Sequence, residues 1–201
     1  MVPMVSFCDI PLSELKEHIT KYGNCGIGFT KDWAKKHRLN PVLYLEGQSD
    51  LSCSFERIIT DYLLNVKIGK ETDAVVLLVD VLRYIKNYQE NLIRRDKSVT
   101  ENYRFSDERE WRYVPPRCDE YGMLLGPADY ETDKTKHDQS LEHLSLSFEP
   151  NDIKYTIIQN DNEISEFISF LRNVKGGKYS LFDIERLTTR ILTTEQIKSD
   201  F

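Results

Sequence analysis

The spacing of apolar residues divides the chain into segments with a helical period and segments with the period of a strand. In the middle of the chain, six apolar residues fall at helical steps and predict one amphipathic helix: Phe55, Ile58, Ile59, Tyr62, Leu63 and Val66. Residues 74–82 are also apolar, and three- and four-residue steps continue through Ile85, Tyr88 and Leu92. This run is too long for an ordinary strand and therefore predicts one long buried helix.

The N-terminal part of the chain alternates short apolar runs with residues that begin or end helices. Ser13 and Thr30 each stand where a helix would begin, and Gly23 stands where the first of these helices would end. Trp33 is the predicted core residue of the second helix. The predicted strands are 4–10, 25–29 and 42–45, and the predicted helices are 14–21 and 31–37.

The second half of the chain opens with an irregular stretch, residues 118–136, which is rich in Asp, Glu, Gly and Pro. Such a stretch is typical of a functional or a disordered loop, and the pattern does not choose between the two. Strands are predicted at 144–148 and 153–159. An amphipathic helix is predicted at 163–172, with these residues facing inward: Ile164, Phe167, Ile168 and Leu171.

The C-terminal tail alternates at Leu187, Thr189 and Ile191 and then reaches Thr194, a predicted cap for a short final helix. Across the chain, helices and strands follow one another without regular alternation. This order predicts an α+β fold with a small mixed or antiparallel sheet and packed helices.

Length and composition favour one globular domain over residues 1–201. A chain of 201 residues, of which 40% are hydrophobic, can bury one sizeable core. The net charge of −6 has the wrong sign for a protein that follows phosphate backbones, so we do not expect direct nucleic-acid binding. No apolar run approaches the roughly 20 residues of a membrane helix, and the first residues lack a signal-peptide pattern, so we expect no membrane partner and a cytoplasmic location.

Cysteine and histidine spacing predicts no metal centre. The four cysteines include no C-x-x-C pair, and the four histidines complete no ligand spacing. We expect reduced thiols, no metal and no cofactor from these residues, which are Cys8, Cys25, Cys53, Cys118, His18, His37, His137 and His143.

The segment 107–116 carries the strongest candidate chemistry, because charges of both signs enter an aromatic strand that ends at two prolines. In an extended chain, alternation sends Glu110 and Arg112 to one face with Glu108 and Val114. Arg109, Trp111 and Tyr113 take the other face, where we expect Trp111 and Tyr113 to face the core. A glutamate fixed by a neighbouring arginine suits a catalytic or ligand-reading carboxylate, and it suits a structural salt bridge equally well.

Gly26 and Gly28 leave one face of the strand at 25–29 nearly bare. A bare strand surface lets another backbone or a ligand approach closely. A bulge or tight packing is the commoner cause of such glycines.

Motifs along nearly the whole chain carry a family resemblance. They lie at 3–13, where the sequence begins PMVSFCDIP, and at 22–33, 40–44, 107–115 and 189–201. In this order they resemble the AbiGi family, which is named for abortive phage resistance and labelled antitoxin. The resemblance implies a role in phage defence as the partner of a nucleotidyltransferase-like toxin in a bicistronic system.

The sequence departs from that family at its start. Family members carry a further short segment, with a His-Phe-Thr-like motif and an Asn-Leu helix, ahead of the PMVSFCDIP motif, whereas this sequence begins on the motif. That segment, a strand carrying residues 6–9 and a late strand carrying Glu110 distantly resemble the ADP-ribosyltransferase layout. This weaker resemblance implies NAD as cofactor, Glu110 as catalytic glutamate and Asp9 as a pocket residue. Either the start codon is assigned too late or the segment is missing. Without the first motif, the chain would bind the dinucleotide poorly or not at all.

Three hypotheses follow for the function. The first is a non-enzymatic antitoxin that restrains a cognate toxin protein, the second is an ADP-ribosyltransferase-like enzyme or its degenerate relative, and the third is a DNA-binding autoregulator. No helix-turn-helix with a basic recognition helix supports the third. The candidate pocket residues, which we expect near Glu110, are Cys8, Asp9, Gly26, Gly28, Arg109, Trp111 and Arg112.

Overall fold

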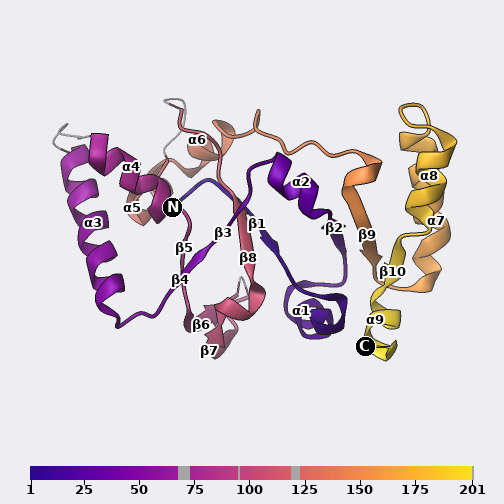
Figure 1. Ribbon diagram of the computed structural model, residues 1–201, viewed down its shortest axis with the longest axis horizontal. Helices are drawn as coiled ribbons and strands as arrows, with labels where there is room; N and C mark the ends of the chain where they lie inside the picture. The colour runs from indigo at the N-terminus through magenta and orange to yellow at the C-terminus, as the bar shows by residue number, and fades with distance from the viewer. Residues whose placement is uncertain (68–72, 95, 119–122, 201) are drawn as a thin grey trace. The chain divides into compact units, whose positions relative to one another are not determined.

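The computed structural model describes residues 1–201 except 68–72, 95, 119–122 and 201 (Figure 1). It mixes helices with small sheets, so the α+β prediction is confirmed. Contacts divide the chain into two compact units, and each is built from two stretches of sequence. We call residues 1–9 and 39–145 the first unit, and residues 10–38 and 146–201 the second unit. The expectation of a single domain stays a prediction.

The first unit contains a three-stranded antiparallel sheet of β1 (Val5–Cys8), β8 (Glu110–Tyr113) and β3 (Asn40–Pro41), with β8 in the centre. In its register Ser6 lies opposite Arg112, and Cys8 lies opposite Glu110. The motif strand near the N-terminus and the charged strand a hundred residues later are therefore direct neighbours.

Two smaller sheets complete the strands described in the first unit. β4 (Leu43–Leu45) pairs in parallel with β5 (Ile85–Asn87). β6 (Gln89–Ile93) and β7 (Val99–Arg104) form an antiparallel hairpin. The chain then turns through a short 3₁₀ helix, η2 (Phe105–Glu108), directly into β8.

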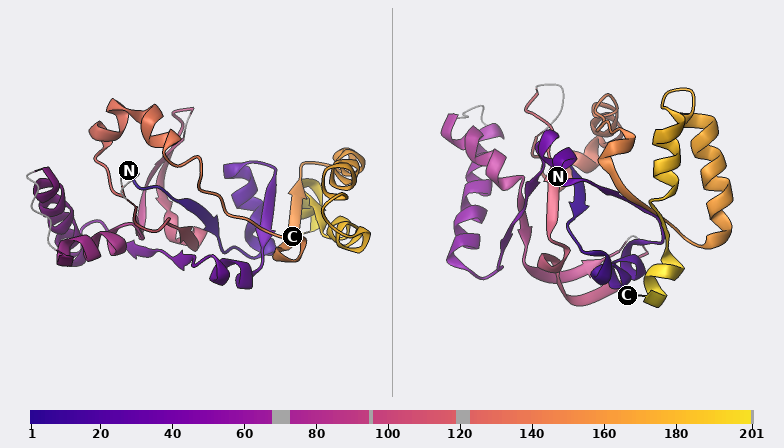
Figure 2. Two further views of the ribbon diagram at one scale, coloured as in Figure 1. Left: turned by 90° about the horizontal axis from the view of Figure 1, so that it is seen from above. Right: turned by 45° about the vertical axis from the view of Figure 1, so that its right-hand side comes forward.

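The first pair of helices in this unit is α3 (Asp50–Lys67) and α4 (Asp73–Leu82), which pack against each other (Figure 2). The predicted helix at residues 55–66 is confirmed, although the side chains of Leu63 and Val66 lie outside the described residues. The predicted single long helix after residue 74 is wrong beyond Leu82. The Leu43 N–H donates a hydrogen bond to the Tyr84 carbonyl, and β5 pairs with β4. Strand pairing therefore overrides the helical spacing of the apolar residues.

Helices also occupy part of the stretch predicted to be irregular. α5 (Pro127–Thr132) begins with a proline at its first position, which has no N–H to leave unpaired. α6 (Lys134–Gln139) follows at once. The prediction for 118–136 is therefore wrong in its second half, and residues 119–122 lie outside the described residues.

The second unit is built on a sheet with the order β10-β9-β2. β9 (Ile153–Ile158) lies between β2 (Gly26–Phe29), which is antiparallel to it, and β10 (Ile191–Thr193), which is parallel. The predicted strands at 25–29 and 153–159 are confirmed.

Helices surround this sheet in the second unit. Their bounds are η1 (Leu12–Glu14), α1 (Leu15–Tyr22), α2 (Lys31–Lys36), η3 (Pro150–Asp152), η4 (Asp161–Glu163), α7 (Ile164–Phe170), η5 (Leu171–Lys175), α8 (Leu181–Thr188) and α9 (Thr194–Asp200). As predicted, α1 ends at Gly23, whose φ of +118° suits glycine, and Thr30 caps α2 by accepting a hydrogen bond from the Trp33 N–H. Trp33 is buried.

Three predictions for the second half of the chain need correction. Residues 144–148 form no strand. In this segment the Ser147 carbonyl accepts a hydrogen bond from the side chain of Trp33, with its Nε1 at 3.0 Å, and not from a neighbouring strand. The alternation at Leu187 and Thr189 is not extended, since α8 continues to Thr188. The final helix is capped by Thr193, whose Oγ1 accepts from the Gln196 N–H, and not by Thr194.

Two apolar clusters form the core of the second unit. Helices α1 and α9 meet β9 in one cluster, which contains Leu15, Ile19, Ile157 and Ile197. α8 and η5 meet the start of β9 in the other, which contains Ile153, Leu171, Ile184 and Leu187. The second cluster explains part of the predicted inward face of the helix at 163–172, because Leu171 is buried in it and Phe167 packs against it.

Candidate functional site

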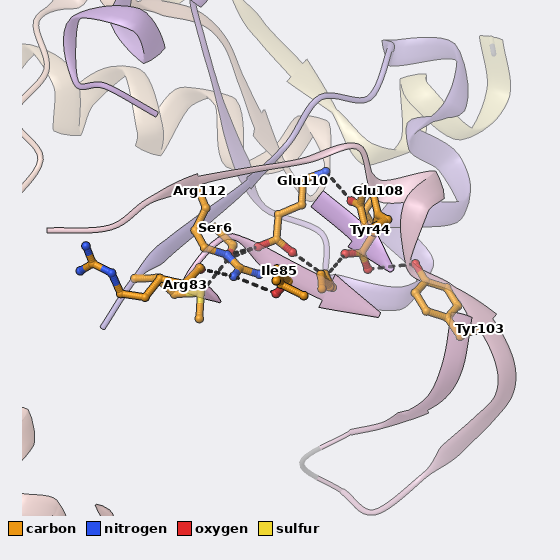
Figure 3. A network of polar contacts seen from close by, with 10 residues as sticks. Ser6, Tyr44, Arg83, Ile85, Tyr103, Glu108, Glu110 and Arg112 are labelled. Carbon is orange, nitrogen blue, oxygen red and sulfur yellow. Dashed lines mark hydrogen bonds and ion pairs between the residues drawn. The ribbon is translucent and has the colours of Figure 1, made fainter. Parts of the chain in front are cut away.

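Glu110 lies at the centre of a closed polar network in the first unit (Figure 3). Its Oε1 accepts hydrogen bonds from Ser6 Oγ and from Arg112 Nε, each at 2.8 Å. Its Oε2 accepts from Lys86 Nζ at 2.5 Å. Both carboxylate oxygens are therefore occupied by donors from three different strands, β1, β5 and β8.

A second carboxylate, Glu108, shares the same lysine. Glu108 Oε2 lies 2.6 Å from Lys86 Nζ, and its Oε1 accepts from the Tyr103 hydroxyl at 3.1 Å (Figure 3). Lys86 thus bridges two carboxylates, and Arg112 supplies the second positive charge. The four formal charges cancel, which is the condition under which buried ions are tolerated.

Main-chain contacts fix the network to the surrounding strands. Arg112 Nη1 donates to the carbonyls of Arg83 at 2.6 Å and Ile85 at 3.4 Å. The Glu110 N–H donates to the Tyr44 hydroxyl oxygen at 2.8 Å, which attaches β8 to β4. The network therefore joins the three-stranded sheet to the β4–β5 pair.

The local backbone explains how both glutamates reach one lysine. Within β8 the period of two places Glu110 and Arg112 on the same side. Glu108 is not in the strand but ends η2, and Arg109 between them takes a left-handed conformation with φ of +47°. This turn permits Glu108 to approach Lys86 from the end of the strand.

Burial and hydrogen bonding have opposite effects on the ionisation of the network. The exposed fractions of Glu108, Glu110 and Arg112 are 4%, 3% and 6%. Burial alone would raise the pKa of Glu110, but hydrogen bonds from Lys86, Ser6 and Arg112 hold that pKa below its usual range. Burial alone would lower the pKa of Lys86, but its two glutamate partners raise it. Both groups are therefore charged near neutral pH.

A neighbouring ion cluster lies at the end of α4. Asp80 pairs with Arg83 and also with Arg117, whose Nε lies 3.2 Å from both carboxylate oxygens. Arg83 Nη1 also donates to the Pro115 carbonyl at 3.2 Å. Partial burial would raise the pKa of Asp80, but the two arginines lower it. This cluster attaches the residues after β8 to α4.

The prediction that Glu110 and Arg112 share a strand face is confirmed, and the prediction that Trp111 and Tyr113 face the core is wrong. The charged face is the buried one, and Trp111 and Tyr113 are only half-buried. The inversion is possible because Lys86, which the sequence pattern had assigned to a helix, supplies the missing countercharge.

The motif strand β1 places Cys8 and Asp9 beside the network. Cys8 lies opposite Glu110, and the Asp9 N–H donates to the Arg109 carbonyl at 3.2 Å. Although Cys8 is exposed as a residue, burial of its thiol by nearby protein and the charge of Glu108 raise its pKa to about 12. A protonated thiol is a poor nucleophile. A shared cleft for Asp9 and Glu110 stays a prediction.

Gly26 and Gly28 belong to the second unit, so they take no part in this network. A Cβ on Gly28 would lie 2.4 Å from ring atoms of Tyr155, so the space over Gly28 is filled by an aromatic ring. A Cβ on Gly26 would meet only Ile157 Cδ1, at 3.9 Å. Tight packing against Tyr155 is therefore what the structure shows at Gly28.

Sequence patterns missed three members of the network. Lys86, Tyr44 and Tyr103 come from β5, β4 and β7. Lys86 and Tyr44 lie 24 and 66 residues from Glu110, whereas Tyr103 lies five residues from its partner Glu108. The available signal was the excess of acidic over basic residues in the segment 107–116. If its glutamates are buried, a cation from elsewhere in the chain must neutralise them.

The part of the chain that the structure describes contains neither a metal-binding cluster nor a membrane-spanning helix. No group of three or more His, Cys, Asp and Glu side chains is placed to hold a metal ion. Among the same residues, no helix has both the length and the apolar character needed to span a bilayer.

The chain is similar in sequence to a known protein family and to one named protein. A family model described as "Putative abortive phage resistance protein AbiGi, antitoxin" matches residues 1–159, which include both glutamates of the network. The chain belongs to the AbiGi family. The abortive phage resistance protein AbiGi of Lactococcus lactis subsp. cremoris is 28% identical over 224 residues, covering 100% of this chain and 89% of that protein. No solved structure matches.

Membership of the AbiGi family gives the network a context. Residues 1–159 contain every residue of the network, whereas α7 to α9 of the second unit lie beyond the matched region. The family resemblance expected from the motifs is therefore confirmed, and the family description supports the association with abortive phage resistance and the antitoxin label.

Proposed function

We propose that this AbiGi-family chain is the antitoxin of an abortive-infection system and holds a nucleotidyltransferase-like toxin inactive by binding it. The observation that carries the proposal is the closure of the Glu110 network. The best catalytic candidate in the sequence is 3% exposed, and both of its oxygens accept hydrogen bonds from the protein itself.

Catalysis by Glu110 would require an accessible oxygen and a proton to exchange. A general base must come within about 3 Å of the proton that it removes, whereas the positions around Glu110 are taken by Ser6, Lys86 and Arg112. Its lowered pKa keeps Glu110 ionised, and Lys86 stays protonated. These properties favour a structural element that shapes a binding protein.

The charge distribution supports a partner with a positively charged surface. In sequence, the first unit contains 14 Lys and Arg residues against 21 Asp and Glu residues, a net charge of −7, and the second unit has a net charge of +1. A toxin that acts on nucleotides or nucleic acid needs cationic groups for phosphate. An acidic unit would be attracted to that surface and would increase the association rate.

The first experiment is co-expression of the chain with its cognate toxin. We expect restored growth and a purified complex of the two proteins, since an antitoxin acts through contact. Growth arrest that persists when both proteins are expressed and folded would contradict the proposal.

Matched charge reversals then locate the contact. The variant Asp129→Lys, Glu131→Lys, Glu142→Lys changes exposed residues of the first unit, and the control Glu166→Lys, Glu185→Lys, Glu195→Lys changes exposed residues of the second. We expect the first to slow association with the toxin by about tenfold or more at low salt and the second to have little effect. Equal effects of the two variants would contradict the electrostatic part of the proposal.

One observation favours a second candidate, an ADP-ribosyltransferase-like enzyme with NAD as cofactor. The strands that carry Ser6 to Cys8 and Glu110 are hydrogen-bonded neighbours, and Ser6 contacts Glu110 directly. This adjacency of the two strands is the support for the second candidate. Glu110 would have to leave Lys86 and Arg112 to reach a nicotinamide ribose.

Incubation of the purified chain with NAD separates the candidates. For an antitoxin we expect no consumption of NAD, and growth rescue per folded molecule that is unchanged by Glu110→Gln. NAD consumption that Glu110→Gln abolishes, in a variant whose circular dichroism matches the parent protein, would favour the transferase over the antitoxin.

A further inference from the structure

An apolar cleft of about 800 Å³ opens in the second unit between the sheet and α7. One wall is a sheet face: Ile27 lies opposite Thr156 in the register of β2 and β9, so these two side chains lie on the same face, and both line the cleft. The other wall contains Phe167 and Phe170 of α7. A cavity of this size is large enough to receive several side chains of another molecule.

The surface of the cleft is apolar, exposed and electrically neutral. The exposed fractions of Ile27, Phe148 and Phe170 are 48%, 40% and 52%. The charged residues in its lining, Glu149 and Lys178, lie 3.7 Å apart and neutralise each other at the rim. Contiguous exposed apolar surface of this kind marks an interaction site, and its occupant must be apolar and uncharged.

A partner is not expected to bind at the cleft by adding a strand to the sheet of the second unit. β2 and β10 are the edge strands of the described sheet, but they have only four and three residues, and the register of β2 shifts between Gly28 and Phe29. Short length and a bulge are features that protect an edge from pairing with another strand. Contact through side chains is the remaining mode.

The charge distribution favours a second copy of this chain over a cationic partner as the occupant. A cationic partner would be drawn to the first unit, with its net charge of −7, and not to the neutral cleft. Two copies of this chain would repel each other through their first units, whereas second units of net charge +1 approach with little repulsion. An apolar neutral face also matches itself, which is the requirement for a two-fold symmetric interface.

We propose that the cleft face of the second unit is the interface of a homodimer. Each copy places exposed aromatic side chains, Phe148 and Phe170, against the cleft of the other. This inference is independent of the proposed function, because it rests on the cleft and on the net charges of the two units, and not on the binding of a toxin.

Sedimentation equilibrium of the full chain tests the interface directly. We expect a mass twice the chain mass of 23.6 kDa, little changed by salt because the contact is apolar. Phe170→Glu should raise the dimer dissociation constant at least about tenfold, since buried aromatic residues dominate interface energies. The matched control is Leu77→Glu on α4 of the first unit, which is 67% exposed and should leave the dimer intact.

Circular dichroism melting shows whether each variant is folded, and Ile27→Asp provides a second cleft variant if Phe170→Glu is not. A monomeric parent protein at high concentration would overturn the inference. Dissociation by Leu77→Glu but not by the cleft variants would overturn it as well. If the parent protein is monomeric and the cleft variants lose toxin binding, the occupant is the toxin and not a second copy.

Discussion

Apolar side chains are buried in both units of this chain, but among the described residues the first unit also buries charged side chains. The buried charged residues of the described chain, Arg83, Glu108, Glu110 and Arg112, all belong to the first unit. Both apolar clusters belong to the second unit, where the buried polar residues are the threonines Thr193 and Thr194. A charged interior depends on every partner being present, whereas an apolar interior loses stability in proportion to the volume removed.

The largest effect is expected from Glu110→Gln in the first unit. The substitution leaves Lys86 and Arg112 with one carboxylate between them inside the protein, and breaking a buried ion pair costs about 3–5 kcal/mol. Chemical denaturation measures the loss. The exposed Glu142→Gln is the control and should change the free energy of unfolding by less than about 0.5 kcal/mol. Similar small values for both variants would show that the network does not hold the first unit together.

Truncation of a buried apolar side chain in the second unit is the comparison for Glu110→Gln in the first unit. Ile184 is 1% exposed within its apolar cluster, and Ile184→Ala should cost about 2–4 kcal/mol through lost burial and the cavity that remains. Unlike the loss in the first unit, this one should be the same at about pH 3 and about pH 7, because no carboxylate takes part in it. A strong pH dependence of the Ile184→Ala effect, measured by urea denaturation, would remove the contrast between the units.

A matched pair of glycine substitutions examines the sheet of the second unit. Gly28→Ala places a methyl group against the Tyr155 ring and should destabilise the protein by about 1–3 kcal/mol. Gly26→Ala meets only an ordinary contact and should change the free energy of unfolding by less than about 0.5 kcal/mol. Thermal melting of the two variants measures the difference, and equal effects would mean that packing against Tyr155 is not what requires glycine.

The smallest effect is the pH dependence contributed by Glu110. Because its pKa is lowered in the folded state, its stabilisation is present above the unfolded pKa, about 4.3, and is lost as pH falls toward the folded value. The stability difference between the parent protein and Glu110→Gln should therefore shrink below about pH 4. Denaturation at a series of pH values gives this difference, and a gap that stays constant down to pH 3 or so would show that Glu110 is not ionised in the fold.

Local patterns predicted much of the secondary structure but not the interior of the first unit. The period of two correctly placed Glu110 and Arg112 together, and the cap at Thr30 and the stop at Gly23 correctly bounded their helices. The charged face of β8 is buried because Lys86 neutralises it, and Lys86 lies 24 residues from Glu110. Lys86 also stands in a segment whose apolar residues have helical spacing. Pairing of β5 with β4 decided its conformation, and no local signal reports such a pairing.

Both units are assembled from segments that are distant in sequence, and this determines when each unit can complete its fold during synthesis. β1 pairs with β8, so the first unit lacks its central strand until residue 113 has left the ribosome. The second unit waits still longer, because Ile197 of α9, which is 0% exposed, packs with Leu15 and Ile19 of α1. A nascent chain therefore carries an exposed α1 until α9 has been synthesised, and a premature stop before α9 would leave the second unit without one side of its core.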